Sequence, residues 1–164
     1  ERAIKIDEKA LGPEHTDLAR DLNNLASLLH AHDKHGEAKP LYERVIQILE
    51  KALGPEHPHV ASALGNLAGV LQGEDEYMND EAIRKYDEAK ALYERAIKID
   101  EKALGPEHTD LARDFNNLAS LLHAYDERDE VKPLYERVVK ILEKALGPEH
   151  PQVSPALRNL AEFL

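Results

Sequence analysis

Apolar residues recur along this chain at the spacing of amphipathic helices, and the stripes come in pairs separated by short polar stretches. The first stripe steps by 4, 3 and 4 residues through Leu18, Leu22, Leu25 and Leu29. The second runs through Leu41, Val45, Ile48 and Ala52. Since a helix turns once every 3.6 residues, each stripe predicts a helix with one buried face, and each pair predicts a helical hairpin.

One hexapeptide, Ala-Leu-Gly-Pro-Glu-His, marks the end of each second helix. Its copies begin 42, 51 and 42 residues apart, at Ala10, Ala52, Ala103 and Ala145. Its glycine can adopt the left-handed conformation that ends a helix, and its proline prevents the helix from continuing. We expect the histidine near the N-cap of the next helix, because in two copies it precedes a proline, which suits the first helical position.

The sequence is also duplicated on a larger scale. Residues 1–71 align without gaps onto residues 94–164, with 57 identities. The middle spacing exceeds the others by nine residues, which the alignment places near residues 77–85. A continuous apolar stripe favours a helix that begins near Asp80 and protrudes. A nine-residue loop is the alternative, because Glu74-Asp75-Glu76 is a poor sequence for a helix interior.

The net charge argues against several classes of function. The chain carries 21 Lys and Arg against 32 Asp and Glu, a formal charge of −11, which opposes the phosphate attraction used in binding nucleic acids and anionic membranes. No apolar run reaches the roughly 18 residues of a membrane-spanning helix. The absence of cysteine excludes disulfides, thiolate metal sites and cysteine nucleophiles. We expect no nucleic-acid partner and no membrane association.

The hairpin unit resembles the tetratricopeptide repeat, which has small residues where helices cross and one aromatic residue in the second helix. The small residues are Ala26, Ala68, Ala119 and Ala161 in first helices, and Ala38 and Ala89 in second helices. The aromatic residues are Tyr42, Tyr93 and Tyr135, whereas Val131 departs from the small-residue rule. The 42-residue period and the Leu-Gly-Pro-Glu-His-Pro joint look like the longer variety found in kinesin light chains.

The resemblance covers the whole chain and implies an all-α fold, a right-handed superhelical solenoid of about eight helices. We expect one domain, residues 1–164, made of a half repeat (1–15), a hairpin (16–57), a hairpin with the nine-residue insert (58–108), a hairpin (109–150) and a half repeat (151–164). The resemblance also implies binding of a protein or peptide on the concave surface formed by the first helices. We expect a cytoplasmic protein.

The face of each first helix opposite its buried stripe supplies the candidate binding residues. They are Arg20, Asn23, Ser27, His30, Asn66, Gly69, Arg113, Asn116, Ser120, His123 and Arg158. An asparagine amide can bind a peptide backbone, and a guanidinium can pair with a carboxylate through two hydrogen bonds. We therefore expect an extended, acidic peptide in a weakly basic groove. For Asn66 and the other asparagines of the Asn-Leu-Ala segments, a hydrogen bond to the adjacent hairpin is the alternative.

The nine histidines do not indicate a metal site. Four belong to the repeated joint, and only His30 of the cluster His30, His32 and His35 is retained in the second large unit. No phosphate-binding loop, nucleophile elbow or metalloprotease motif is present. We expect no catalytic residue, no metal and no cofactor, and hence no enzyme.

The two ends of the sequence are half repeats. Residues 1–11 read as a second helix without its first, and residues 151–164 as a first helix without its second, so both should leave apolar faces uncovered. A head-to-tail contact between molecules could cover them. The first hypothesis is a non-catalytic scaffold that binds a peptide. The alternative is a structural spacer or self-assembly module of a larger signalling protein, with no peptide ligand of its own.

Overall fold

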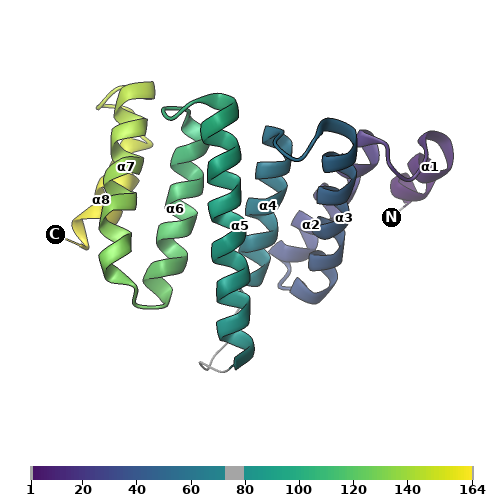
Figure 1. Ribbon diagram of the computed structural model, residues 1–164, viewed down its shortest axis with the longest axis horizontal. Coiled ribbons are helices and arrows are strands. Elements are labelled where there is room, and N and C mark those ends of the chain that lie inside the picture. The colour runs from purple at the N-terminus through teal and green to yellow at the C-terminus, as the bar shows by residue number, and fades with distance from the viewer. Residues whose placement is uncertain (1, 73–79, 164) are drawn as a thin grey trace. The chain divides into compact units, whose positions relative to one another are not determined.

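The computed structural model describes residues 2–72 and 80–163, apart from the side chains of residues 2, 3, 5 and 7. These residues form eight α-helices and no strand (Figure 1). The helices are α1 (Arg2–Leu11), α2 (Thr16–Ala31), α3 (His35–Leu53), α4 (Pro58–Leu71), α5 (Asp80–Leu104), α6 (Thr109–Ala124), α7 (Arg128–Leu146) and α8 (Val153–Ala161). The all-α fold predicted from the paired stripes is confirmed.

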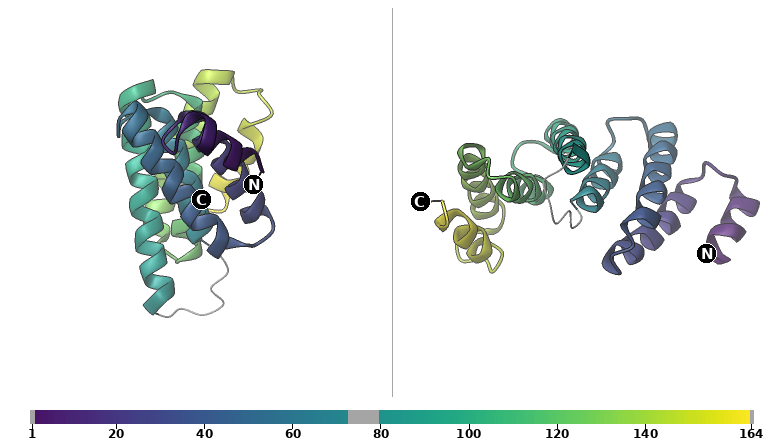
Figure 2. Two further views of the ribbon diagram at one scale, coloured as in Figure 1. Left: turned by 90° about the vertical axis from the view of Figure 1, so that its right-hand side faces the viewer. Right: turned by 90° about the horizontal axis from the view of Figure 1, so that it is seen from below.

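The helices group into two compact units, residues 1–92 and 93–164, and the boundary falls inside α5. In the first unit α3 packs against both α2 and α4, and α1 contacts α2 (Figure 1). In the second unit α7 packs against both α6 and α8 (Figure 2). Each unit is therefore a stack in which a second helix lies between two first helices.

Small and aromatic side chains make the core where these helices meet. Ala26 of α2 and Ala38 of α3 are fully buried, and Tyr42 is buried beside them. Val131, which departs from the small-residue pattern, is also fully buried, so α7 accommodates the larger side chain. Burying a side chain of this size contributes roughly 1.5–3 kcal/mol, so packing of the stripes supplies most of the stability of the stack.

The repeated hexapeptide ends one helix and caps the next. Its four glycines have φ between +89° and +94°. At Gly54 and Gly147 ψ is 154° and 151°, so these C-caps are extended with positive φ, rather than in the left-handed helical conformation that the sequence suggested. This region of backbone conformation is essentially restricted to glycine.

The histidine of the hexapeptide caps the following helix through its side chain. Nδ1 of His57 accepts a hydrogen bond from the backbone N–H of His59 at 3.1 Å. Nδ1 of His15 and of His108 accept the equivalent bonds in two other copies, each at 3.2 Å. The predicted position of His15, His57 and His108 at the N-cap is confirmed, and each cap satisfies a backbone donor that has no partner within the helix. In the fourth copy Nδ1 of His150 accepts from the backbone N–H of Gln152 at 3.3 Å, but Gln152 itself is the N-cap of α8.

The insert lengthens one helix. α5 begins at Asp80 and runs for 25 residues, whereas α3 and α7 have 19 residues each. Pro40 and Pro133 lie near the starts of α3 and α7, while Ala91 stands at that place in α5 and lets the helix extend upstream. The predicted start at Asp80 is confirmed; residues 77–79 of the insert lie outside the described residues.

The glycine of the hexapeptide can be tested by substitution. Gly147→Ala should lower the free energy of unfolding by about 1–3 kcal/mol, because alanine is strained at φ +93° although no atom lies within 4 Å of the added Cβ. Gly36→Ala is the matched control: its Cβ would also meet open space, but within the first turn of α3, and it should raise stability by roughly 0.5–1 kcal/mol. Urea unfolding of both variants measures the difference, and equal effects would contradict this role of Gly147.

Candidate functional site

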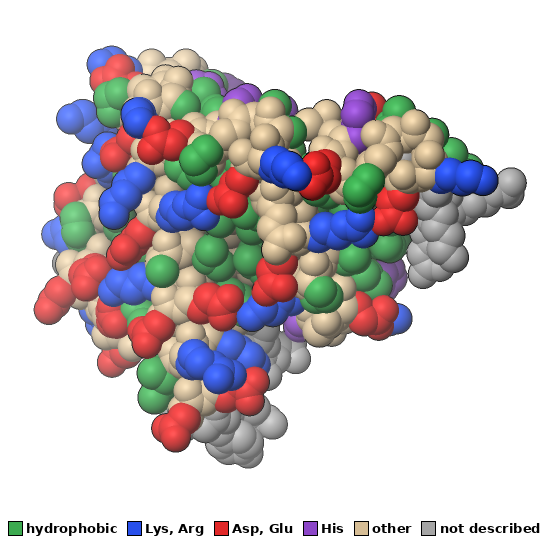
Figure 3. Space-filling view, turned by 45° about the vertical axis from the view of Figure 1, so that its right-hand side comes forward, with side chains coloured by type: hydrophobic (Ala, Val, Ile, Leu, Met, Phe, Trp, Pro, Cys, Tyr) green, Lys and Arg blue, Asp and Glu red, His purple; other side chains and the backbone are tan. Residues whose placement is uncertain are grey.

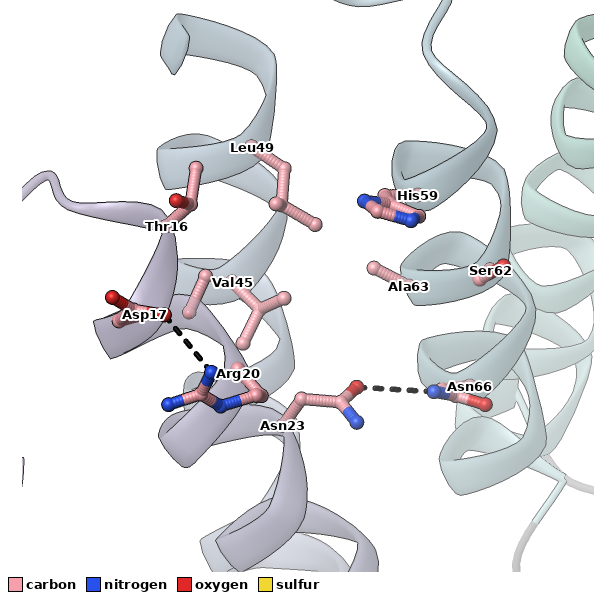
Figure 4. Close-up of a pocket in the computed structure, with 11 residues that line it drawn as sticks. Thr16, Asp17, Arg20, Asn23, Val45, Leu49, His59, Ser62, Ala63 and Asn66 are labelled. Carbon is pink, nitrogen blue, oxygen red and sulfur yellow. Dashed lines mark hydrogen bonds and ion pairs between the residues drawn. The ribbon is translucent and has the colours of Figure 1, made fainter. Parts of the chain in front are cut away.

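A cleft of about 380 Å³ opens in the first unit between the first helices α2 and α4, with α3 as its floor (Figure 4). Its floor is apolar and its rim is polar, a combination typical of ligand-binding clefts. It is lined by Thr16, Asp17, Ala19, Arg20, Asn23, Val45, Leu49, His59, Ser62, Ala63 and Asn66.

The floor of the cleft comes from the same stripes that build the core. Val45 and Leu49 project from α3 and Ala63 faces them from α4 (Figure 4), and Ala19 of α2 also lines the cleft. All four are buried. Because the alanines are short, the two first helices leave space above the α3 side chains. The packing pattern of the repeat therefore produces the cleft directly.

Two asparagines face each other across the cleft. Nδ2 of Asn66 on α4 donates to Oδ1 of Asn23 on α2 at 3.1 Å (Figure 4). The bond fixes the orientation of both amides and leaves the Asn23 nitrogen and the Asn66 oxygen available to a ligand. Asn66 thus makes the hydrogen bond to the neighbouring hairpin that the sequence left open, and Asn23 is its acceptor.

Arg20 stands on the rim in contact with two aspartates of its own helix. Its Nη1 lies 2.9 Å from Asp17 Oδ1, and its Nε lies 3.7 Å from Asp21 Oδ1. These aspartates balance the guanidinium charge that the sequence analysis assigned to a weakly basic groove. Both Arg20 and Asp17 are well exposed, so the pair contributes little to stability and can exchange partners.

The second unit repeats this arrangement between α6 and α8. Nδ2 of Asn159 donates to Oδ1 of Asn116 at 3.1 Å, the same geometry as in the first unit. Arg113 again contacts its own helix, with Nε 3.1 Å from Asp114 Oδ1 and Nη1 3.8 Å from Asp110 Oδ1. The duplication of the sequence is thus a duplication of the asparagine pair and of the paired arginine.

The predicted serines bond within their own units. The hydroxyl of Ser27 lies 2.8 Å from the hydroxyl of Tyr42 on α3. Ser120, its repeat equivalent, donates instead to the backbone carbonyl of Asn116 at 2.9 Å. Gly69 is half-buried on α4 and Arg158 is exposed on α8, and neither lines the α2–α4 cleft.

The predicted histidines lie at the opposite ends of the first helices from the caps. Nδ1 of His30 is 3.1 Å from Nδ1 of His35 on α3. Partial burial and, after it, the neighbouring His35 lower the pKa of His30, while Asp33 opposes the shift. In the second unit His123 meets the edge of the Phe163 ring instead, at 5.0 Å between centroids. No group of three or more potential metal-ligating side chains occurs among the described residues.

Several residues that line the cleft or its repeat equivalent were not among the candidate binding residues predicted from the sequence. Asp17 was detectable as a carboxylate three positions before Arg20, the spacing of an intrahelical ion pair. Val45 belongs to a predicted buried stripe and Leu49 lies one turn further along the same helix, but sequence periodicity alone does not show that part of a buried face forms the floor of a cleft. Asn159 was not among the candidate binding residues either; it stands at the position of Asn66 in the second large unit and makes the bond to the adjacent hairpin that the sequence offered for these asparagines.

Away from this face, basic side chains of the second helices α3 and α7 pair with glutamates of the preceding second helix or joint. Lys51 binds Glu14 and Arg44 binds Glu8 in the first unit, and Lys144 binds Glu107 in the second. On the surface seen in Figure 3, basic and acidic side chains are interspersed rather than gathered by sign. None of the described helices combines the length and the apolarity needed to cross a membrane.

Comparison with known proteins identifies the repeat. The model of the tetratricopeptide repeat family matches residues 1–51, 22–77 and 81–144. Among solved structures, the nearly identical TPR-like repeats of a Podosopora anserina protein described as a kinesin light chain are 30% identical, with a TM-score of 0.74 over 91% of this chain and 66% of that one. A variant of the same repeats is 29% identical with the same TM-score.

A third structure, BtubC (BKLC) from P. vanneervenii, is 23% identical, with a TM-score of 0.77 over 91% of this chain and 56% of that one, and shows the fold alone. The chain spans about two thirds or less of the length of these solved chains. No curated protein sequence matches it significantly. Because the family model matches most of the sequence and the described helices form the corresponding hairpins, the chain belongs to the tetratricopeptide repeat family, in its kinesin-light-chain-like variety, and is a scaffold for protein–protein interaction.

Proposed function

We propose that this protein is a non-catalytic cytoplasmic scaffold that binds an extended, acidic peptide segment on the face made by its first helices. The observation that carries the proposal is the α2–α4 cleft, in which an apolar floor is combined with an oriented asparagine pair and an exchangeable arginine. Membership of the tetratricopeptide repeat family supports a protein partner.

The cleft suits three parts of a peptide at once. An apolar side chain can occupy the space above Val45 and Leu49, where its burial contributes about 25 cal/mol per Å² of apolar area. The peptide backbone can bind the free nitrogen of Asn23 and the free oxygen of Asn66. A ligand carboxylate can replace Asp17 on Arg20, because an exposed ion pair is worth at most about 1 kcal/mol.

A second candidate function, self-assembly, is favoured by two exposed apolar side chains. Ile6 of α1 and Leu157 of α8 are 55% and 45% exposed, although their repeat equivalents Ile99 and Leu64 are buried. A second copy that covers these faces would give a mass that rises with concentration in light scattering. A monomeric mass across a wide concentration range would rule it out.

Charge reversal tests the acidic ligand. A peptide-array screen should enrich acidic sequences, and Arg20→Glu and Arg113→Glu should each weaken capture by about tenfold or more, because a charge-assisted pair becomes a repulsion. Lys140→Glu, the same change of charge at an exposed position on the second helix α7, is the control and should retain capture. Enrichment of basic peptides would refute the proposal.

The asparagine pair gives a separate test. Asn66→Ala should weaken binding of a captured peptide several-fold in calorimetry, since it removes one ligand acceptor and the bond that orients Asn23. Unfolding stability should change by only about 1 kcal/mol or less, because the bond is exposed. Asn24→Ala is the control: Asn24 is the exposed neighbour of Asn23 on α2 and does not line the cleft. Equal losses of affinity in both variants would argue against binding at the pair.

A further inference from the structure

Two carboxyl groups are buried together in the second unit, Asp100 near the end of α5 and Asp114 in α6. Each is 1% exposed, and they are the only buried charged residues among those described. Their side chains share a hydrogen bond. Oδ1 of Asp100 and Oδ2 of Asp114 have no hydrogen-bond partner in the described part of the chain. Burying a carboxylate in this way is costly unless it is paired.

Packing of the repeat does not require these carboxyl groups. At the equivalent positions, the α3–α4 joint holds Leu49 and Ala63. The α7–α8 joint holds Leu142 and Ala156. All four are buried, so an apolar pair fills the same space in both units. The two aspartates therefore stand where an apolar contact would cost less desolvation free energy. This difference indicates a role other than packing.

The pair connects directly to a candidate binding residue. Nε of Arg113 donates to Oδ1 of Asp114 at 3.1 Å, while the rest of its side chain is about half exposed. In the first unit Arg20 contacts Asp21 at 3.7 Å, and Asp21 keeps 20% exposure. Arg113 therefore donates a hydrogen bond to a buried carboxyl group, whereas Arg20 lies beyond hydrogen-bond distance of a partly exposed one.

The electrostatic environment favours one shared proton. Burial, together with the charge and hydrogen bond of Asp114, raises the pKa of Asp100 to about 7. Burial also raises the pKa of Asp114, and the adjacent Arg113 opposes that rise. Asp110 on α6 adds a further negative charge that raises both. Two adjacent carboxyl groups in a buried site cannot both ionise readily, so their titration belongs to the pair.

Other charged groups around the pair do not neutralise it. Burial, and after it the charge of Asp114, raises the pKa of Tyr93 on α5, so its phenol remains neutral. Nδ1 of His108 lies 3.5 Å from Oδ2 of Asp110. Arg137 on α7 pairs with Glu101, and its Cζ lies 4.5 Å from the centre of the Phe115 ring. Arg113 contacts the pair directly, through the bond from its Nε to Asp114.

We propose that Asp100 and Asp114 hold one proton between them at neutral pH and retain Arg113 against α6, and that a second proton releases Arg113 to bind an acidic ligand. With one proton the pair carries a single negative charge, which Arg113 balances. When the second proton binds, the pair is neutral and the guanidinium has no buried counterion. Asp114 is in this sense a positioning residue for Arg113.

The same coupling acts in the reverse direction, and it rests on the proposed function. A peptide carboxylate that draws Arg113 away leaves the buried pair without its cation, so the pair takes up a proton. Since linkage is reciprocal, acidic peptides should bind more tightly as the pH falls, and binding should consume protons.

The proton on the pair can be measured without any ligand. In the full labelled chain, NMR should show the first shared proton as a change in the side-chain carboxyl carbons of Asp100 and Asp114 near neutral pH. The Nε–H signal of Arg113 should stay protected from exchange through that step and lose its protection only when the second proton binds at lower pH. Titration of both carboxyl groups near pH 4, or an Arg113 signal that is unchanged throughout, would overturn the proposal.

Unfolding stability gives a second readout with a defined sign. Because the folded pKa lies above that of the unfolded chain, the native state holds the extra proton between about pH 4 and pH 7. Stability is then greatest at the acid end of this range, and the folding equilibrium constant falls by up to about tenfold per pH unit as the pH rises. The double variant Asp100→Leu/Asp114→Ala, which copies the α7–α8 joint, should lose this fall and be more stable than the parent at pH 8. An unchanged pH profile would contradict a shared proton.

A third experiment measures the affinity of the chain for the acidic peptide selected on the array, between pH 8 and pH 5.5. Its affinity for the parent chain should rise by several-fold as the pH falls, and the double variant should lose this rise while still binding. Asp126→Asn, which removes an exposed carboxylate where asparagine tolerates the positive φ, is the control and should keep the parent profile. Failure to find any acidic peptide would refute the proposed function and the ligand coupling, while the carbon titration would still decide whether the pair shares a proton.

Discussion

The structure depends on a backbone constraint at the four copies of Leu-Gly-Pro-Glu-His. Glycine at φ near +90° takes the chain out of the helix, proline blocks its continuation, and the histidine side chain caps the helix that follows. Each joint therefore turns the chain in the same way. Successive first helices lie side by side within a unit, so that Asn23 meets Asn66, one position beyond its repeat equivalent Gly65, and Asn116 meets Asn159 in the same way in the other unit.

The candidate site follows from that regularity and from the choice of small residues. Ala19 and Ala63 leave room above Val45 and Leu49, and the asparagine pair bridges the cleft beside this apolar floor. The Asp100–Asp114 pair stands where the α3–α4 and α7–α8 joints hold buried apolar residues, although the sequence of the α1–α2 joint carries Asp7 and Asp21 at the same positions. Since a buried carboxyl pair weakens packing at neutral pH, its presence next to Arg113 links the stability of the second unit to the chemistry of its binding face.

Most of the fold could be predicted because local signals agree. The stripes, the helix stops and the caps each depend on a few adjacent residues, and the long α5 could be recognised from Ala91 in place of a proline. The site was harder, since its contacts join residues about 43 positions apart. Ser27 was expected to face a ligand, yet its hydroxyl lies against Tyr42, and Arg20 was expected to carry free charge, yet Asp17 contacts it. Side-chain partners of this kind depend on rotamers, which periodicity does not determine.

The central claim is that the α2–α4 cleft holds a peptide by its asparagine pair. The most direct measurement follows the side-chain amide signals of Asn23 and Asn66 by NMR while an acidic peptide is added to the full chain. Both signals should shift and saturate together, with the methyl signals of Val45 and Leu49 following them. Saturating shifts confined to the second helices, with the Asn23 and Asn66 amides unchanged, would contradict it.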